Sequence, residues 1–232
     1  LGGVLAVAKN FFALGAKVHL ITAWGNEYHN LIEKNLPQQS SNFSFTRIES
    51  PVTIQKKRYV DKASNNRVFE TYVISDDKEY LIKPVVIENY LKNNASIHNI
   101  VIMDYGHGVL DHTKTGDYLR LFSNSTVNTQ SNAGNRGFNP ISNYYGAERV
   151  FLNGSEVQIE MRNVAGFREQ IIESLAKKIN CDELYVTNGS NGIITYGKKD
   201  GISTVPTFAP RIVDRTGAGD AALTVVTLLR NI

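Results

Sequence analysis

The chain has 232 residues, of which 42% are hydrophobic and 20% are charged, as in an ordinary globular protein with one large core. The formal net charge of +3 is too small to indicate nucleic-acid binding, and no apolar run approaches the ~20 residues of a membrane span. Cys181 is the single cysteine, which excludes a disulfide framework and favours a reducing compartment, so we expect a cytoplasmic protein.

The first elements have the rhythm of a parallel α/β sheet. Gly2-Gly3 leads into Val4–Leu14, where apolar residues recur at helical spacing, and Gly15 ends the predicted helix. Lys17–Ala23 then predicts a short buried strand. The glycine pair either lets the backbone approach a ligand closely or forms a plain tight turn, and the sequence leaves these two interpretations level.

The pattern changes between Asn42 and Asp76. Polar and apolar residues alternate in Phe43–Arg47, Val52–Val60 and Arg67–Ile74, with a predicted turn at Ser64-Asn65-Asn66. We expect three antiparallel strands that form a small sheet, roughly 42–76, which either closes over a site as a lid or pairs with a second subunit. The alternative is a β insertion that has no role in the site.

The α/β rhythm resumes at Lys83, with a predicted helix at Val85–Asn93 and a strand at His98–Met103. Asp104 and His107 follow the strand, and ligands of open parallel sheets collect at the carboxyl ends of strands. His107, between two glycines, is a candidate contact for a phosphate or a substrate hydroxyl, although a histidine in a surface loop is more often a bystander. A helix, a strand and an irregular loop are expected next, at Thr113–Phe122, Thr126–Thr129 and Ser131–Asn143.

Another strand, Glu148–Leu152, is followed by Asn153-Gly154-Ser155-Glu156 at the start of a helix. Asn followed three positions later by Glu matches a capping box. The functional alternative is that Glu156 orders a water-coordinated Mg²⁺ near nucleotide phosphates.

The next elements are predicted as a helix at Gly166–Lys178, a buried strand at Leu184–Thr187, and hairpin strands at Ile193–Tyr196 and Ser203–Val205. Thr187 and Gly189, at the end of the buried strand, offer a hydroxyl and an amide to a phosphate, although both are also ordinary turn residues.

Near the C-terminus, Asp214-Arg215-Thr216-Gly217-Ala218-Gly219-Asp220 runs into an apolar helix. The backbone amides at such a helix start form an anion site, helped by the helix dipole. Asp220 in that site is either a helix cap or a base that takes a proton from a hydroxyl while the amides receive a phosphoryl group.

These motifs together resemble the PfkB (ribokinase-like) carbohydrate kinases. The resemblance spans nearly the whole chain and is carried by Gly2-Gly3, Asn153-x-x-Glu156, Val186-Thr187-x-Gly189-x-x-Gly192 and Asp214-x-x-Gly217-Ala218-Gly219-Asp220. Within that family, Thr53–Arg58, Arg67–Glu70 and Asp104–Gly108 are most similar to the heptose-phosphate kinases of lipopolysaccharide precursor synthesis.

The resemblance implies a three-layer α/β/α sandwich with a β lid, formed by a single kinase domain, 1–232, that is truncated at both ends. It also implies ATP and Mg²⁺ as cofactors, a sugar or sugar phosphate as substrate, a homodimer through the lid, and a fused or partner nucleotidyltransferase domain. By motif position Asp220 is the catalytic base, with the amides of Gly217, Ala218 and Gly219 as anion hole. The implied nucleotide and Mg²⁺ residues are Thr187, Gly189, Asn153 and Glu156, with Glu156 on the metal side, and the implied substrate residues are Gly2, Gly3, Arg58, Asp104 and His107.

Two other functions stay open at this point. A non-catalytic sugar-phosphate-binding or dimerisation half of a bifunctional protein is favoured by Ala6, which stands where family members commonly have an asparagine that contacts the sugar. A nucleoside kinase of the same fold is disfavoured by the polar lid residues Gln55, Lys56, Arg58 and Arg67. The sequence has no Walker A loop, which excludes the P-loop enzymes. It also has no Gly-x-Gly-x-x-Gly after the first strand, which argues against a dinucleotide oxidoreductase.

Overall fold

The computed structural model describes residues 2–63, 67–75, 81–97, 99–132, 134–163, 169–208 and 217–229. The chain forms two compact units. The smaller unit comprises Gly3–Ile82 with His107–Leu110, and the larger unit comprises Lys83–Gly106 with the chain from Asp111 onward. The single-domain organisation therefore stays a prediction. None of the described helices is long and apolar enough to cross a membrane.

The smaller unit begins with helix α1 (Val4–Ala13), strand β1 (Val18–Trp24), a 3-10 turn, helix α2 (His29–Asn35) and strand β2 (Phe43–Glu49). Its core is a cluster of buried apolar side chains: Ala8, Leu20, Trp24, Ile32, Leu36 and Phe43. The predicted first helix and first strand are both confirmed.

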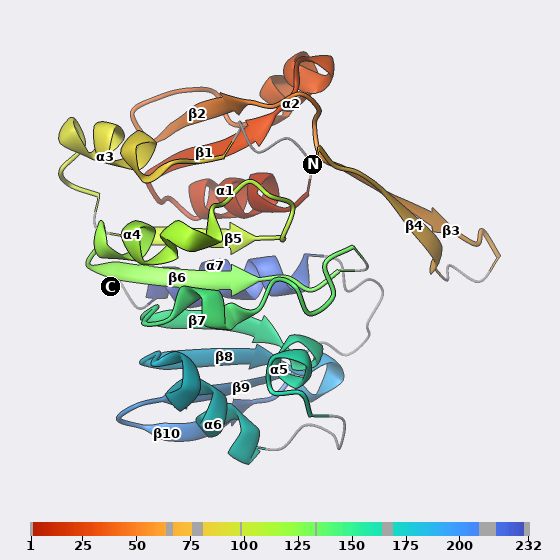
Figure 1. Cartoon of the computed structure of the whole chain (residues 1–232), viewed down its shortest axis with the longest axis vertical. Coiled ribbons are helices and arrows are strands. Elements are labelled where there is room, and N and C mark those ends of the chain that lie inside the picture. The colour runs from red at the N-terminus through yellow and green to blue at the C-terminus, as the bar shows by residue number, and fades with distance from the viewer. Residues whose placement is uncertain are drawn as a thin grey trace. The chain divides into compact units, whose positions relative to one another are not determined.

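The second part of the smaller unit is a hairpin of β3 (Gln55–Val60) and β4 (Arg67–Val73), which pair in antiparallel fashion (Figure 1). The expected third antiparallel strand is wrong, because β2 pairs in parallel with β1, from Val18 opposite Phe43 to Trp24 opposite Glu49. This pairing lets Phe43 join the apolar core beside α1. The predicted turn at 64–66 lies outside the described residues, and the lid role and its 42–76 range stay predictions.

The larger unit has a six-stranded sheet in the order β10-β9-β8-β7-β6-β5. Strands β5 (Asn99–Asp104), β6 (Asn124–Thr129), β7 (Arg149–Asn153) and β8 (Glu183–Thr187) are parallel, and β9 (Ile193–Gly197) and β10 (Gly201–Val205) add an antiparallel hairpin. The described helices of this unit are α3 (Pro84–Lys92), α4 (Thr115–Arg120), α5 (Gly154–Glu160), α6 (Glu169–Ile179) and α7 (Ala218–Leu229), with 3-10 turns at His112–Lys114, Ile141–Tyr144 and Gly189–Asn191.

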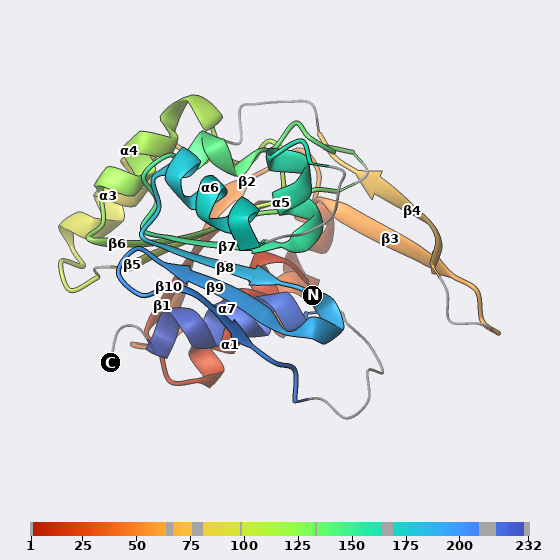
Figure 2. The same ribbon diagram turned by 90° about the horizontal axis from the view of Figure 1, so that it is seen from below.

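Helices cover both faces of this sheet. In Figure 2, α5 and α6 lie on one face and α7 lies on the other, which gives the expected α/β/α layers. The apolar spacing of α6 explains its position, because Ile172, Leu175, Ala176 and Ile179 are all buried. Strand β6 is buried from Ser125 to Thr129, as expected for a strand covered on both faces.

Candidate active site

The carboxyl ends of the parallel strands bring several candidate residues to one edge of the larger unit's sheet. Asp104 ends β5 opposite Thr129 of β6, and Asn153 ends β7 opposite Thr187 of β8. Figure 1 shows that α7 runs against the strand direction, so its first turn lies at this same edge. Ligands of open parallel sheets bind at this edge.

The first turn of α7 presents its backbone to solvent. Gly217, at φ 81°, precedes the helix, and its carbonyl accepts from Ala221 N at 2.9 Å. The amides before Ala221 belong to the turn in which backbone donors have no partner within the helix. Gly217, Ala218 and Gly219 are exposed, and a Cβ at either glycine would meet nothing within 4 Å. The described chain therefore leaves room beside both glycines, and residues 214–216 lie outside the described chain.

Asp220 is half-buried in this turn, and burial raises the pKa of its carboxyl. Burial and, to a smaller extent, the Asp220 charge raise the pKa of the Tyr105 phenol. The Thr224 hydroxyl donates to the Asp220 carbonyl oxygen at 2.8 Å and fixes the backbone one turn along. A carboxylate with a raised pKa is a better proton acceptor than an exposed one.

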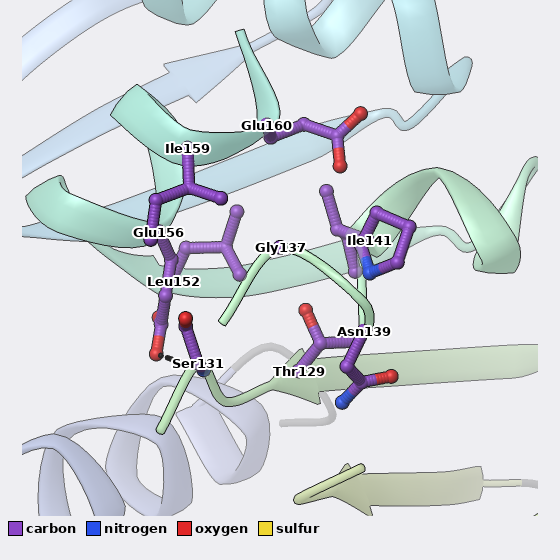
Figure 3. A pocket seen from close by; sticks show the side chains of 10 residues that line it. Thr129, Ser131, Gly137, Asn139, Ile141, Leu152, Glu156, Ile159 and Glu160 are labelled. Atoms are coloured by element: carbon purple, nitrogen blue, oxygen red, sulfur yellow. Dashed lines mark hydrogen bonds between the residues drawn. The ribbon is translucent and has the colours of Figure 1, made fainter. Parts of the chain in front are cut away.

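Asn153 and Glu156 form the predicted capping box at the start of α5. Glu156 N donates to Asn153 Oδ1 at 2.9 Å, and Asn153 N donates to Glu156 Oε2 at 2.8 Å. The other Glu156 oxygen accepts from Ser131 N at 3.2 Å, which ties α5 to the loop after β6 (Figure 3). Burial raises the pKa of Glu156 to about 7, against the lowering effect of these hydrogen bonds. The structural interpretation of this motif is therefore confirmed.

Glu156 also lines a small pocket together with Thr129, Ser131, Asn139, Ile141 and Glu160 (Figure 3). Among the described residues, no group of three or more His, Cys, Asp or Glu side chains is placed to hold a metal ion. A protein-built Mg²⁺ cage does not fit this donor set. A carboxylate oxygen accepts more than one hydrogen bond, so Glu156 fits an outer role toward the water of a Mg²⁺ that phosphate oxygens hold.

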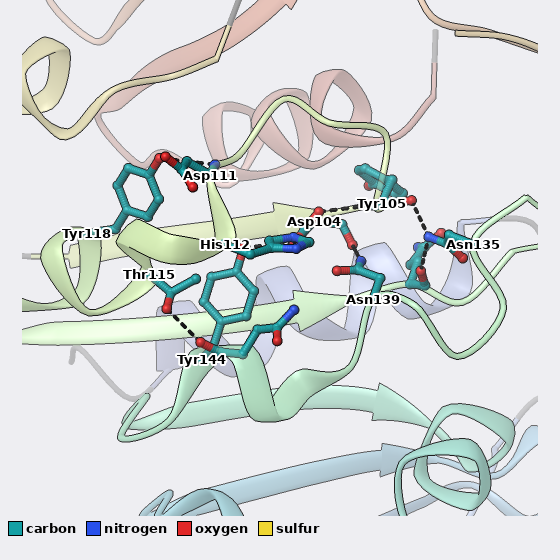
Figure 4. Close-up of polar contacts among 12 residues, drawn as sticks. Asp104, Tyr105, Asp111, His112, Thr115, Tyr118, Asn135, Asn139 and Tyr144 are labelled. Carbon is teal, nitrogen blue, oxygen red and sulfur yellow. Dashed lines mark hydrogen bonds and ion pairs between the residues drawn. The ribbon is translucent and has the colours of Figure 1, made fainter. Parts of the chain in front are cut away.

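The Asp104 carboxylate is buried and bound within the chain (Figure 4). Its Oδ1 accepts from Gly106 N at 2.9 Å, and its Oδ2 accepts from Tyr144 Oη at 2.8 Å and lies 2.8 Å from His112 Nε2. Burial tends to raise the pKa of Asp104, but the hydrogen bonds from His112 and Gly106 outweigh it and lower the pKa. These contacts show Asp104 positioning the loop after β5, and a substrate contact for it stays a prediction.

Thr187 ends β8, and Gly189 begins the 3-10 turn that follows it. Thr187 is half-buried, and Gly189 has φ 58° with open space where a Cβ would stand. Asn188 N donates to Gly192 O at 2.8 Å, which closes the turn. Both residues thus belong to a closed turn at the end of β8, and a nucleotide contact for either residue stays a prediction.

The remaining candidates behave differently from one another. Gly3 caps α1 with φ 61°, a conformation that favours glycine, whereas Gly2 is exposed in open space. In the smaller unit, the Arg58 Nε donates to Glu70 Oε1 at 2.8 Å, and the His107 ring lies edge-on to Tyr72 with centroids 5.9 Å apart. The structure groups Arg58 and His107 in one unit and Asp220 in the other.

Sequence reasoning missed the partners that hold these candidates. Tyr144 and His112 bind Asp104, and no local motif points to a residue 40 positions away. Glu70 was missed as a binding partner of Arg58, although the alternation of the hairpin strands places the two on one face.

No protein-family model matches the chain. The chain is 27% identical to the Bifunctional protein HldE of Aliarcobacter butzleri over 96% of this chain and 47% of that protein. It is also 27% identical to the Bifunctional protein HldE of Psychromonas ingrahamii over 97% of this chain and 46% of that protein. The chain thus spans about half the length of the curated relatives that it matches.

Among solved structures, phosphofructokinase-2 from Escherichia coli in complex with fructose-6-phosphate has a TM-score of 0.70 at 15% identity, over 99% of this chain and 76% of that one. A pyrophosphate-dependent kinase in the ribokinase family has a TM-score of 0.65 at 14% identity, over 100% of this chain and 80% of that one. The chain has the ribokinase-like fold. The comparisons agree with the resemblance to PfkB carbohydrate kinases, and the phosphotransferase activity that this resemblance implies is taken up as a proposal below.

Proposed function

We propose that this chain transfers the γ-phosphoryl group of ATP to a hydroxyl of a sugar or sugar phosphate, with Asp220 as general base. One observation carries the proposal: a half-buried carboxyl of raised pKa stands in the first turn of α7, directly after the exposed residues Gly217, Ala218 and Gly219. Phosphoryl transfer depends on alignment of the reactants and on neutralisation of phosphate charge more than on covalent catalysis. The proposed turn offers a carboxylate to align the acceptor hydroxyl and backbone amides to neutralise the phosphate charge.

The proposed reaction has one proton and one phosphoryl group to account for. The acceptor O–H gives its proton to the Asp220 carboxylate as its oxygen bonds to the γ-phosphorus, and the bond to the departing ADP oxygen breaks. The amides of Gly217, Ala218 and Gly219 donate to the phosphoryl oxygens, where negative charge is concentrated. Mg²⁺, when bound with ATP, neutralises phosphate charge.

The remaining roles follow by motif position. Thr187 and Gly189 line the nucleotide site, and the Asn153–Glu156 capping box keeps α5 in place beside the phosphates. Gly2, Gly3, Arg58, Asp104 and His107 serve acceptor binding, with Asp104 acting through the loop that it holds. The resemblance of Thr53–Arg58, Arg67–Glu70 and Asp104–Gly108 to the heptose-phosphate kinases supports a heptose phosphate as acceptor.

The relatives named bifunctional support a second function outside the region that this chain matches. A fused or partner nucleotidyltransferase domain is the form we propose for it. The same relationship keeps a non-catalytic, sugar-phosphate-binding half as the second candidate function, and Ala6 favours that candidate.

The β3–β4 hairpin supplies a surface for a homodimer. Tyr59 and Phe69 stack on one face of it with ring centroids 4.2 Å apart, and they stay 45% and 52% exposed. Exposed aromatic pairs of this kind mark protein interfaces more often than open surface.

A phosphoryl-acceptor screen tests the proposal. The panel contains free sugars, sugar phosphates including heptose 7-phosphate, and adenosine, with ATP and Mg²⁺ as donor system. Turnover of a sugar or sugar phosphate supports it, and preferential turnover of adenosine supports the nucleoside kinase. Sugar-phosphate binding without ATP binding or turnover supports the non-catalytic candidate.

A further inference from the structure

One face of the β3–β4 hairpin carries a cluster of paired charges. The antiparallel register places Lys56 opposite Tyr72 and Arg58 opposite Glu70. Directly opposed residues project from the same face of a strand pair, so these four side chains share one face. Tyr59 and Phe69, which are also opposed, occupy the other face.

Glu70 is the centre of this cluster. Its Oε1 accepts from Arg58 Nε at 2.8 Å, and its Oε2 accepts from Tyr72 Oη at 3.0 Å and lies 3.0 Å from Lys56 Nζ. Lys56 Nζ also lies over the Tyr72 ring, 5.2 Å from its centroid. A guanidinium, an ammonium and a phenol converging on two oxygens form a complete anion site, and here the chain's own carboxylate fills it.

The carboxylate is held firmly in that site. The Glu70 side chain is 18% exposed, against 34% for each of Lys56 and Arg58. Burial tends to raise the pKa of Glu70, but the hydrogen bonds from Lys56, Arg58 and Tyr72 outweigh it and lower the pKa to about 2. Glu70 is therefore ionised throughout the physiological pH range, and an incoming anion must compete with it.

We propose that Glu70 is a specificity-determining residue that occupies the hairpin's anion site and weakens the binding of a phosphate there. A hydroxyl-bearing part of the acceptor, which donates to carboxylates and accepts from cations, is then preferred at this face. This inference rests on the proposed function in one respect, namely that the hairpin contacts the acceptor.

The test measures equilibrium binding of inorganic phosphate to the full chain by calorimetry. Removing one competing negative charge near a protein surface is expected to tighten phosphate binding by about tenfold in Glu70→Gln. Glu33→Gln makes the same chemical change on α2 of the same unit and is expected to leave the Kd within about twofold of wild type. Phosphate bound elsewhere is common to all variants and cancels in the comparison.

Replacing Arg58, in wild type and in Glu70→Gln, provides a second test of phosphate binding. Because Glu70 fills the site, Arg58→Ala alone is expected to leave phosphate binding nearly unchanged, whereas in the Glu70→Gln background it is expected to abolish the gain. Equal or weaker phosphate binding by folded Glu70→Gln, or a large loss with Arg58→Ala alone, overturns the proposal.

A kinetic arm separates this inference from the proposed function. For Glu70→Gln, the KM for glucose 6-phosphate should fall relative to the KM for glucose, with kcat unchanged. If no variant turns over any acceptor, the proposed function fails, while the phosphate-binding result still decides the role of Glu70.

Discussion

Tyr144 donates a hydrogen bond of 2.8 Å to the carboxylate of Asp104, which lies 40 residues earlier in the chain. The same carboxylate oxygen lies 2.8 Å from His112 Nε2. Three segments of the larger unit therefore meet at one buried negative charge: the end of β5, the turn before α4 and the turn before β7. The Asp104 carboxylate thereby holds the loop that begins with Tyr105. The charge of Asp220 helps to raise the pKa of Tyr105.

Replacing Asp104 tests that arrangement. Asp104→Asn should lower the free energy of unfolding by about 2–3 kcal/mol at pH 5.5, because hydrogen bonds to charged groups are lost in a buried place. Urea denaturation measures the difference. The conservative size of asparagine excludes a cavity as its cause.

The pH dependence of that difference has a defined sign. The pKa of His112 is raised in the folded protein, chiefly by its hydrogen bond to Asp104. The protonated His112 therefore adds its full contribution to the free energy of unfolding below pH about 6.5, and this contribution is lost as the pH rises through the raised pKa. The pKa of Asp104 is lowered in the folded protein. Its carboxylate therefore contributes to the free energy of unfolding above pH about 3.9, and this contribution is lost as the pH falls through the lowered pKa. The Asp104→Asn difference should therefore be larger at pH 5.5 than at pH 8. A His112→Gln background should remove this pH dependence, and its persistence there would contradict the assignment.

Two glycines of the β9–β10 region should differ in their tolerance of a side chain. Gly192 has φ 88°, and a Cβ there would overlap the Val205 carbonyl oxygen. Gly201 has φ 73° with nothing within 4 Å of the Cβ position. Gly201→Ala should cost about 1 kcal/mol of unfolding free energy, from backbone strain alone, and Gly192→Ala should cost clearly more. Equal urea midpoints for the two variants would show that the overlap is absent.

The proposed homodimer depends on the aromatic face of the hairpin. Phe69→Thr should weaken self-association by about tenfold, the scale of one well-packed interface residue, when measured by sedimentation equilibrium. Val68→Thr is the matched control, because Val68 is 65% exposed and precedes Phe69 on the same strand but is not part of the stacked Tyr59–Phe69 pair. Similar effects of both substitutions would place the dimer contact elsewhere.

Local signals in the sequence predicted much of the fold. Helical spacing ended by Gly15 gave α1, and Asn153 with Glu156 gave the capping box, because both depend on residues within one or two turns. The ribokinase-like fold followed from motifs in a fixed order along the chain, and the comparisons confirm it.

The sequence did not predict which residues or strands distant in the chain contact one another. The alternation in Phe43–Glu49 indicates a strand but not its partner, so the parallel pairing with β1 was missed. The same limit applies to Asp104, whose bond to Tyr144 depends on the packing of distant segments. The roles of Asp220 and of the residues around it stay predictions, because the position of a carboxyl group in a helix turn does not by itself identify a reaction.

The central claim is that Asp220 takes the proton of the acceptor. Asp220→Asn removes the base but keeps the shape of the side chain, and turnover of the acceptor found in the screen should fall by about 10²–10⁴-fold. Folding should be unharmed, because burial already disfavours the ionised form of this carboxyl. Asp117→Asn, on the exposed surface of α4, is the matched control and should keep wild-type turnover.

The decisive measurement is kcat of folded Asp220→Asn beside wild type at saturating ATP and acceptor. A loss of at least about a hundredfold, with an unchanged urea midpoint and an ATP Kd within about twofold of wild type, is the result predicted for a general base. Wild-type kcat in a folded Asp220→Asn protein would contradict the account.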